Sequence, residues 1–125
     1  MEMKVKGGCF CGMIRYEFDA EDIPVADCHC TMCRRTSGAP YVTWLVVPVE
    51  QFRYLSGQVR TLDSSKEGTR YFCGDCGTPI ACVNQSHPEI IDITLGSLDE
   101  PENYEPGFSV FEDTRLPYLY GHAPP

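Results

Sequence analysis

Seven of the eight cysteines in this 125-residue chain lie in three short clusters, which makes them the first candidates for chemistry. The clusters span residues 9–11, 28–33 and 73–76, with the sequences Cys-Phe-Cys, Cys-His-Cys-Thr-Met-Cys and Cys-Gly-Asp-Cys. Residues 1–6 contain no hydrophobic signal segment, so we expect a cytoplasmic protein. In that setting, closely spaced cysteines indicate metal ligands before they indicate disulfides. Thiolates are preferred ligands of Zn²⁺, so the clusters predict zinc binding.

A disulfide framework is the alternative, because eight cysteines are an even number and allow 105 pairings. A bridge within a Cys-x-Cys pair would be strained, however, since two cysteines so close in sequence cannot easily reach the required geometry. We therefore favour metal binding over disulfides.

The seven clustered cysteines divide naturally into four plus three. Gly follows the last cysteine of the first and third clusters and suits the tight turn of a zinc knuckle, because Gly readily adopts a positive φ. These two clusters are expected to form one closed site. Spacing alone also permits other partitions, such as one that places the first cluster with two cysteines of the second. The closed site that we favour consists of Cys9, Cys11, Cys73 and Cys76.

The second cluster then supplies three thiolates, Cys28, Cys30 and Cys33, from one six-residue segment. Three protein ligands with an open fourth position are typical of catalytic zinc. Cys82 could fill that position, although we interpret it as a small buried strand residue. His29 is expected to point away from the metal, with Asp27 as a residue that could orient it for proton transfer.

Arg34 and Arg35 directly follow the three-cysteine cluster. They could offset the negative charge of a zinc centre with three thiolates, or they could receive the carboxylate of an anionic ligand. His87 and His122 are interpreted as surface residues.

The overall charge limits the classes of partner. The formal net charge is −8, which disfavours nucleic-acid binding because the phosphate backbone is also negative. The sequence contains no run of 18 apolar residues, so no membrane-spanning helix is expected.

The pattern of apolar residues predicts a single, mainly antiparallel β domain over residues 1–125. Ser56-Gly57 is typical of a hairpin turn between strands at 52–55 and 58–62. A short helix is expected at 31–37, with Thr31 as its N-cap. Trp44 is expected in the core. Further strands are expected at 13–18, 41–47, 69–72, 79–83, 90–95 and 108–111, with a hairpin tip at 73–77, an acidic loop at 99–107 and a loose tail at 117–125.

Several motifs together resemble one known family. They are Gly7-Gly8-Cys9-Phe10-Cys11-Gly12 with Arg15-Tyr16, Cys28-His29-Cys30-Thr31-Met32-Cys33-Arg34-Arg35 with Gly38-Ala39-Pro40 and Trp44, Phe72-Cys73-Gly74-Asp75-Cys76-Gly77-Thr78-Pro79, and Ser97-Leu98-Asp99 with Pro101. In these residues the chain resembles the glutathione-dependent formaldehyde-activating enzymes, which include the centromere protein V relatives. Residues 107–111 depart from the family pattern of a His-containing hydrophobic strand followed by Pro-Trp.

The resemblance implies a zinc-binding β-tent fold related to that of the methionine-R-sulfoxide reductases. It also implies a structural zinc on Cys9, Cys11, Cys73 and Cys76, and a second zinc on Cys28, Cys30 and Cys33. Because an open site can lose its metal to chelators or thiols, we expect the second zinc site to be only partly occupied. The implied activity is carbon–sulfur lyase-like and joins glutathione or another small thiol to an aldehyde such as formaldehyde. The alternative is a non-catalytic, zinc-stabilised binding module or a carrier of the thiol or its adduct.

Overall fold

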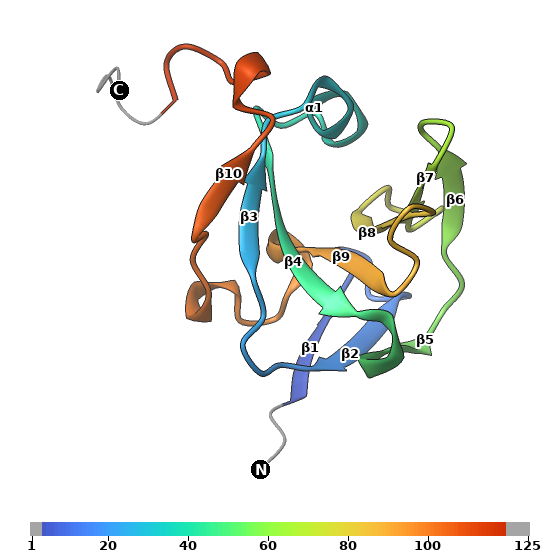
Figure 1. The fold of residues 1–125 in the computed structure, drawn as a ribbon. Helices are drawn as coiled ribbons and strands as arrows, with labels where there is room; N and C mark the ends of the chain where they lie inside the picture. Colours follow the sequence, from blue (N-terminus) through green and yellow to red (C-terminus); the bar gives the residue numbers. More distant parts are fainter. Residues whose placement is uncertain (1–3, 120–125) are drawn as a thin grey trace.

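The structure is a computed structural model that describes residues 4–119 of the chain. Its strands form two sheets (Figure 1). The smaller sheet is antiparallel and has the order β1 (Lys4–Gly8), β2 (Arg15–Asp19) and β5 (Phe52–Ser56). The prediction of a mainly β fold is confirmed.

The larger sheet has seven strands, and all neighbours are antiparallel except β10 (Phe108–Val110) and β3 (Val25–Cys28), which run parallel. Within residues 4–119 there is one α-helix, α1 (Thr31–Ser37), which connects β3 to β4 (Val42–Pro48). Single turns of 3₁₀ helix lie at Val49–Gln51, Leu95–Ser97, Pro101–Asn103 and Glu112–Thr114. The order of the strands is β10 (Phe108–Val110), β3 (Val25–Cys28), β4 (Val42–Pro48), β9 (Ile90–Thr94), β8 (Pro79–Asn84), β7 (Gly68–Phe72) and β6 (Arg60–Asp63).

The main core lies where the small sheet packs against the large one. Ile14, Tyr16 and Phe18 alternate along the chain and are buried together, as their spacing predicts. They pack in one cluster with Leu45 and Ile93 from the centre of the large sheet. Burial of this many large apolar side chains is the main force that holds the two sheets together.

The buried hydroxyl group of Tyr16 links this core to the segment after β9 by a hydrogen bond. The Tyr16 hydroxyl and Ser97 Oγ are 2.6 Å apart, and Thr94 Oγ1 donates to Ser97 Oγ at 2.7 Å. Gly7 must lack a side chain here, since a Cβ would lie 2.4 Å from the Tyr16 hydroxyl oxygen. The hydrogen bonds satisfy polar groups that would otherwise be costly to bury.

The predicted hairpin at Ser56-Gly57 is wrong. Strand β5 pairs with β2 in the small sheet, whereas β6 pairs with β7 in the large one. Gly57 has a φ of 80°, and a Cβ there would lie 2.3 Å from the carbonyl oxygen of Met13. The glycine therefore lets the chain cross from one sheet to the other, instead of reversing within one sheet.

Most other predicted elements are confirmed. Strands lie at each of the other expected positions, and β7 and β8 pair on either side of the 73–77 turn. The helix also spans the predicted residues, but its N-cap is Cys30, whose Sγ accepts a hydrogen bond from the backbone N–H of Cys33. Trp44 is buried, with 8 % of its surface exposed. The expected acidic loop contains the 3₁₀ turn Pro101–Asn103.

The expectation of a loose tail falls partly on residues 120–125, which lie outside the described residues, as does His122. Between residues 4 and 119, no helix is long and apolar enough to cross a membrane.

Candidate functional site

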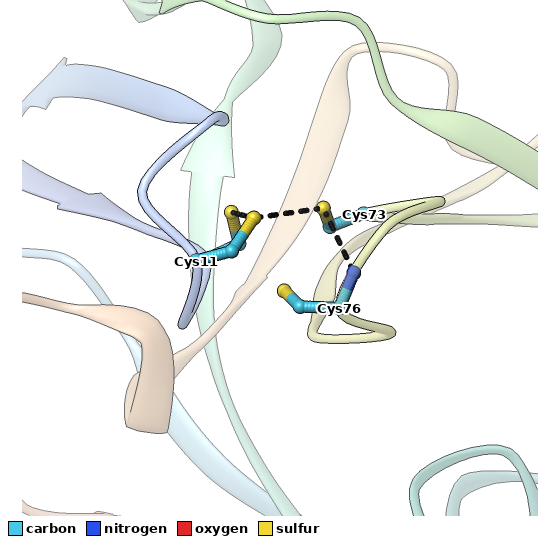
Figure 2. A group of neighbouring side chains, drawn as sticks. Cys11, Cys73 and Cys76 are labelled. Atoms are coloured by element: carbon cyan, nitrogen blue, oxygen red, sulfur yellow. Dashed lines mark hydrogen bonds between the residues drawn. The ribbon is translucent and has the colours of Figure 1, made fainter.

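The structure brings the cysteines together in the four-plus-three grouping that the sequence favours. The four-cysteine cluster contains Cys9 and Cys11 from the β1–β2 loop, and Cys73 and Cys76 from the β7–β8 turn. All four Sγ atoms lie within 4.8 Å of one another, and Figure 2 shows those of Cys11, Cys73 and Cys76 close together. The Sγ atoms of Cys9 and Cys11 are 3.5 Å apart, and those of Cys11 and Cys73 are 3.7 Å apart. A tetrahedral zinc with Zn–S bonds near 2.3 Å would hold its sulfurs about 3.8 Å apart, so this cluster fits zinc.

The two loops that carry these cysteines have similar backbone geometry. Gly12 and Gly77 both have positive φ values, 84° and 83°. Each donates its backbone N–H to the carbonyl oxygen of the first cysteine in its loop, Cys9 or Cys73, at 3.1 and 2.8 Å respectively. The glycine that follows each Cys pair therefore closes a tight turn, as expected for zinc knuckles.

Local hydrogen bonds favour the thiolate form of Cys76 and Cys9 in the four-cysteine cluster, whereas the neighbouring thiols raise the pKa of Cys11 to about 12. The hydrogen bond between Cys76 and the Thr78 hydroxyl lowers the pKa of the Cys76 thiol to about 5. The backbone N–H of Ile14 also donates to Cys9 Sγ at 3.2 Å. Metal ligation requires thiolates, so these donors prepare the cluster for a cation.

The three-cysteine cluster comes from a single loop. Cys28 ends β3, Cys30 caps α1, and Cys33 lies in the first turn of α1. Their Sγ atoms also lie within 4.8 Å of one another. A hydrogen bond of 3.1 Å between Cys28 and Cys33 lowers the pKa of Cys33 to about 5 and raises that of Cys28. Three sulfur donors converge here, with one thiolate already favoured.

A cavity of about 300 Å³ opens beside the three-cysteine cluster. All three of its cysteines line the cavity, together with Trp44 and with side chains from both ends of the large sheet. Ser64 and Arg70 come from the β6–β7 end, whereas Phe108 comes from β10. In Figure 1 these two ends of the sheet lie on opposite sides of β4. The volume is at the lower end of the range for small-molecule sites.

Arg70 is the cation of this cavity, and sequence reasoning did not find it. Its Nη1 and Nη2 atoms lie 3.9 and 3.8 Å from Cys33 Sγ, and its Nε donates to Ser64 Oγ at 3.0 Å. Its guanidinium lies 5.9 Å from the centre of the Trp44 ring. Among the cavity-lining residues within 4–119, it is the only one with a positively charged side chain.

Arg34 and Arg35 lie elsewhere. Arg34 donates from Nη1 to the carbonyl oxygen of Thr114 at 3.3 Å, and Arg35 is exposed on α1. Neither of these two described residues lines the cavity. Their role in receiving a carboxylate stays a prediction, whereas Arg70 is placed where such a group could reach the three-cysteine cluster.

The other candidate ligands differ in their surroundings. His29 is completely buried, and its ring packs against Tyr41 with centroids 5.2 Å apart. The Asp27 carboxylate accepts a hydrogen bond from the Thr43 hydroxyl at 2.5 Å. Cys82 lies on a strand, as predicted, but it is only partly buried and lines the cavity. It lies on β8 outside the group of three converging sulfurs.

Comparison with known proteins agrees with this arrangement. The sequence profile of the family described as glutathione-dependent formaldehyde-activating enzyme matches residues 4–114. The chain belongs to this family. A Halomonas elongata protein named "Putative glutathione-dependent formaldehyde-activating enzyme" is 25 % identical over 107 residues, which cover 78 % of this chain and 67 % of that protein.

A solved structure also resembles this fold. A Rhodobacter sphaeroides protein, known from a crystal structure, matches with a TM-score of 0.65 and 22 % sequence identity. The match covers 83 % of this chain and 98 % of the other. At this identity the likeness is evidence for the fold alone.

Proposed function

We propose that this member of the family joins a small thiol to an aldehyde, or cleaves the resulting adduct, at the three-cysteine cluster. One observation carries the proposal: three converging cysteines line a cavity whose single cation, Arg70, contacts one of them. A closed structural site would have no need for an adjoining ligand-sized space.

The two clusters would hold zinc in different ways. Cys9, Cys11, Cys73 and Cys76 supply four sulfurs, which complete a tetrahedral site and leave no position for a ligand. Cys28, Cys30 and Cys33 supply three, which leaves a fourth position for the thiol of glutathione or a similar molecule. A zinc ion held there would lower the pKa of the bound thiol and stabilise its thiolate at neutral pH.

Arg70 provides the local charge that an anionic thiol requires. The chain has a formal net charge of −8, so its overall field repels anions. The Arg70 guanidinium is half-buried between Cys33 and Trp44, where a carboxylate would meet it with little competition from water. In this proposal, the charged part of the ligand would lie at Arg70 and its sulfur at the cysteines.

The proposed reaction balances without any further reagent. The thiolate sulfur attacks the aldehyde carbon, so a carbon–sulfur bond forms while the carbonyl π bond breaks. The carbonyl oxygen takes up the proton that the thiol released, and the product is a hemithioacetal. The cavity would bring the two reactants together, and positioning of this kind can supply much of the acceleration.

The second candidate function is that of a carrier, which binds the thiol or its adduct without catalysis. The position of His29 favours this function. His29 is the nearest candidate for a proton shuttle in the sequence, but it is completely buried and does not line the cavity. A protein that only binds the adduct would shift the equilibrium between free and bound aldehyde without increasing the rate of addition.

Zinc content provides the test of the proposed site. Zinc per chain would be measured before and after dialysis against millimolar glutathione, with circular dichroism to follow the fold. We expect a fall from about two to about one without loss of structure, because the open site exchanges its ligands. Two zinc ions that remain bound throughout would contradict an open site and favour the non-catalytic binding module.

Initial-rate measurements then distinguish an enzyme from a carrier. The disappearance of free formaldehyde would be followed with glutathione and substoichiometric protein, using Cys30→Ala as the matched control. An enzyme increases the initial rate over the control, whereas a carrier changes only the end point in proportion to its concentration.

A further inference from the structure

The cavity beside the three-cysteine cluster has two chemically different walls. One wall carries Arg70 and the hydroxyls of Ser64 and Ser65. The other carries Phe108, Val110 and Phe111, which come from β10 and the residue that follows it. The adduct of formaldehyde and glutathione would contact the first wall. The one-carbon group that formaldehyde contributes is too small to fill the space beside the second wall.

The apolar wall is fixed to the three-cysteine loop. Strand β10 runs parallel to β3 in a register that places Val110 opposite Cys28. The backbone N–H of His29 donates to the carbonyl oxygen of Val110 at 3.1 Å. The Thr114 hydroxyl donates to the carbonyl oxygen of His29 at 2.8 Å, which ties the following turn to the same loop. The apolar wall therefore keeps a constant position relative to the cysteine sulfurs.

Phe111 has an unusual backbone for a large residue. Its φ and ψ are 55° and 46°, in the left-handed region that favours glycine. Its carbonyl oxygen accepts hydrogen bonds from the backbone N–H and the hydroxyl of Thr114. Such conformations cost free energy and concentrate at ligand sites, where the surrounding contacts hold them in place.

The two phenylalanines are also poorly covered by the protein itself. Phe108 is 50 % exposed and Phe111 is 62 % exposed, although both line the cavity. A ligand with an apolar group would cover these rings and remove their surface from water, which favours binding.

We propose that the cavity binds carboxylate-bearing thiol conjugates whose sulfur substituent is an alkyl or aryl group, with Arg70 receiving the carboxylate and Phe108 and Phe111 covering the apolar group. The inference rests on the proposed function, and it deepens that proposal: the aldehyde partner would be larger and more apolar than formaldehyde.

The test uses two stable conjugates, S-methylglutathione and S-hexylglutathione, with the full-length zinc-loaded protein. Trp44 is the single tryptophan of the chain and lines the cavity, so its fluorescence reports binding directly. Each buried methylene strengthens binding by about fourfold. We expect S-hexylglutathione to bind at least about tenfold more tightly than S-methylglutathione. Equal affinities would overturn the proposal.

Substitutions in each wall test which wall causes the preference for S-hexylglutathione over S-methylglutathione. Phe108→Ala should reduce the ratio of the two affinities severalfold, with little effect on S-methylglutathione. Arg70→Gln should weaken both ligands alike and leave the ratio intact. Phe10→Ala is the matched control, because this phenylalanine is 94 % exposed and does not line the cavity. A ratio that stays unchanged in Phe108→Ala would contradict an apolar wall.

Phe111→Gly separates a ligand-binding role from a structural one. Glycine accepts the positive φ without strain, so we expect the unfolding temperature to stay the same or rise while the affinity ratio falls. A merely structural phenylalanine would lower the unfolding temperature and leave the ratio unchanged, which would overturn the proposal.

The outcomes of this test and of the zinc experiment are distinguishable. Neither conjugate has a free thiol, so their binding does not require addition to an aldehyde. If glutathione removes one zinc but the two conjugates bind with equal affinity, this inference is wrong and the proposed function still stands. If S-hexylglutathione binds tenfold more tightly but both zinc ions stay bound in glutathione, the apolar wall is supported and the proposed function is contradicted.

Discussion

The two cysteine clusters contain the same donor atoms but differ in how much of the chain they join. Cys11 and Cys73 are 62 positions apart and belong to loops of different sheets. Cys28 and Cys33 are five positions apart and belong to one loop. A cation at the first cluster would close a long loop and link the sheets, whereas a cation at the second would order only a short segment.

The difference shows that the role of a thiolate cluster depends on its connectivity and surroundings. The four-cysteine cluster offers a full set of sulfur ligands to one metal ion, which would crosslink distant elements. The three-cysteine cluster has one ligand fewer and faces a cavity with a cation and apolar side chains. We therefore expect changes in the first to affect mainly stability, and changes in the second to affect mainly ligand binding.

The largest expected effect comes from removal of one ligand at each cluster. Cys73→Ala should unfold or precipitate the protein, because the binding energy of a structural metal is part of the folding energy. Cys30→Ala should leave the protein folded and abolish thiol-dependent activity. Circular dichroism and thermal unfolding of both purified variants provide the measurement. Equal destabilisation by the two substitutions would contradict the division into structural and functional clusters.

Graded chelation should produce the next largest effect. A chelator titrated into the zinc-loaded protein is expected to remove the first zinc with the far-ultraviolet spectrum unchanged, and the second with loss of structure. The open cluster loses its metal first because it has three protein ligands and access through the cavity. Simultaneous release of both ions would show that the clusters are energetically coupled, and would contradict their division into a structural and a functional cluster.

A matched pair of glycines gives a smaller effect. Gly77 follows the β7–β8 turn, which carries Cys73 and Cys76, and Gly38 ends α1 after the three-cysteine loop. Both glycines have positive φ, and a Cβ at either would meet no neighbouring atom. Alanine at each position should cost about 1 kcal/mol through backbone strain. Gly77→Ala should also weaken metal binding by the structural cluster, which competition with a fluorescent zinc chelator would measure. Equal zinc affinities for the two variants would show that the turn geometry is unimportant for the cluster.

The smallest effect concerns an ion pair beside the β1–β2 loop, which carries Cys9 and Cys11. Arg15 contacts Asp99 through both Nη atoms, and this contact holds the pKa of the Asp99 carboxyl below its usual value. The pair therefore stabilises the fold above about pH 4, and this contribution is lost as the pH falls through the lowered pKa. Both side chains are substantially exposed, so we expect less than about 1 kcal/mol at neutral pH.

The measurement is the unfolding free energy of wild type and Asp99→Asn between pH 7 and pH 3. The difference should be largest near neutral pH and should shrink in acid. Asp19→Asn is the control, since it removes an exposed pair with Lys4 that is not adjacent to a cysteine loop. A difference that grows as the pH falls would contradict the sign of this prediction.

Local sequence patterns were sufficient for most of the strands and for the grouping of the cysteines. Ile14, Tyr16 and Phe18 alternate with polar residues, and the buried face of β2 follows directly from this alternation. The glycines after the Cys pairs likewise identified the two similar turns that form one cluster. These features depend on neighbours within a few residues, which a single sequence contains.

Features that depend on distant partners could not be predicted in this way. Ser56-Gly57 has the composition of a hairpin turn, and only the contact with Met13 reveals that the chain changes sheets there. Arg70 lies in strand β7, 37 positions from the cysteine that it contacts. Its position beside Cys33 depends on tertiary contacts, for which no short motif in the sequence gives a signal.

The two walls of the cavity are encoded in separate stretches of the chain, and this has a consequence for divergence and for engineering. The cationic wall lies between residues 64 and 70, whereas the aromatic wall lies between residues 108 and 111, after the last cysteine in the sequence. Random mutagenesis restricted to the β10 segment would therefore sample new substituent preferences without altering any sulfur ligand. Within such a family, specificity could drift in the C-terminal strand while the metal chemistry is inherited unchanged.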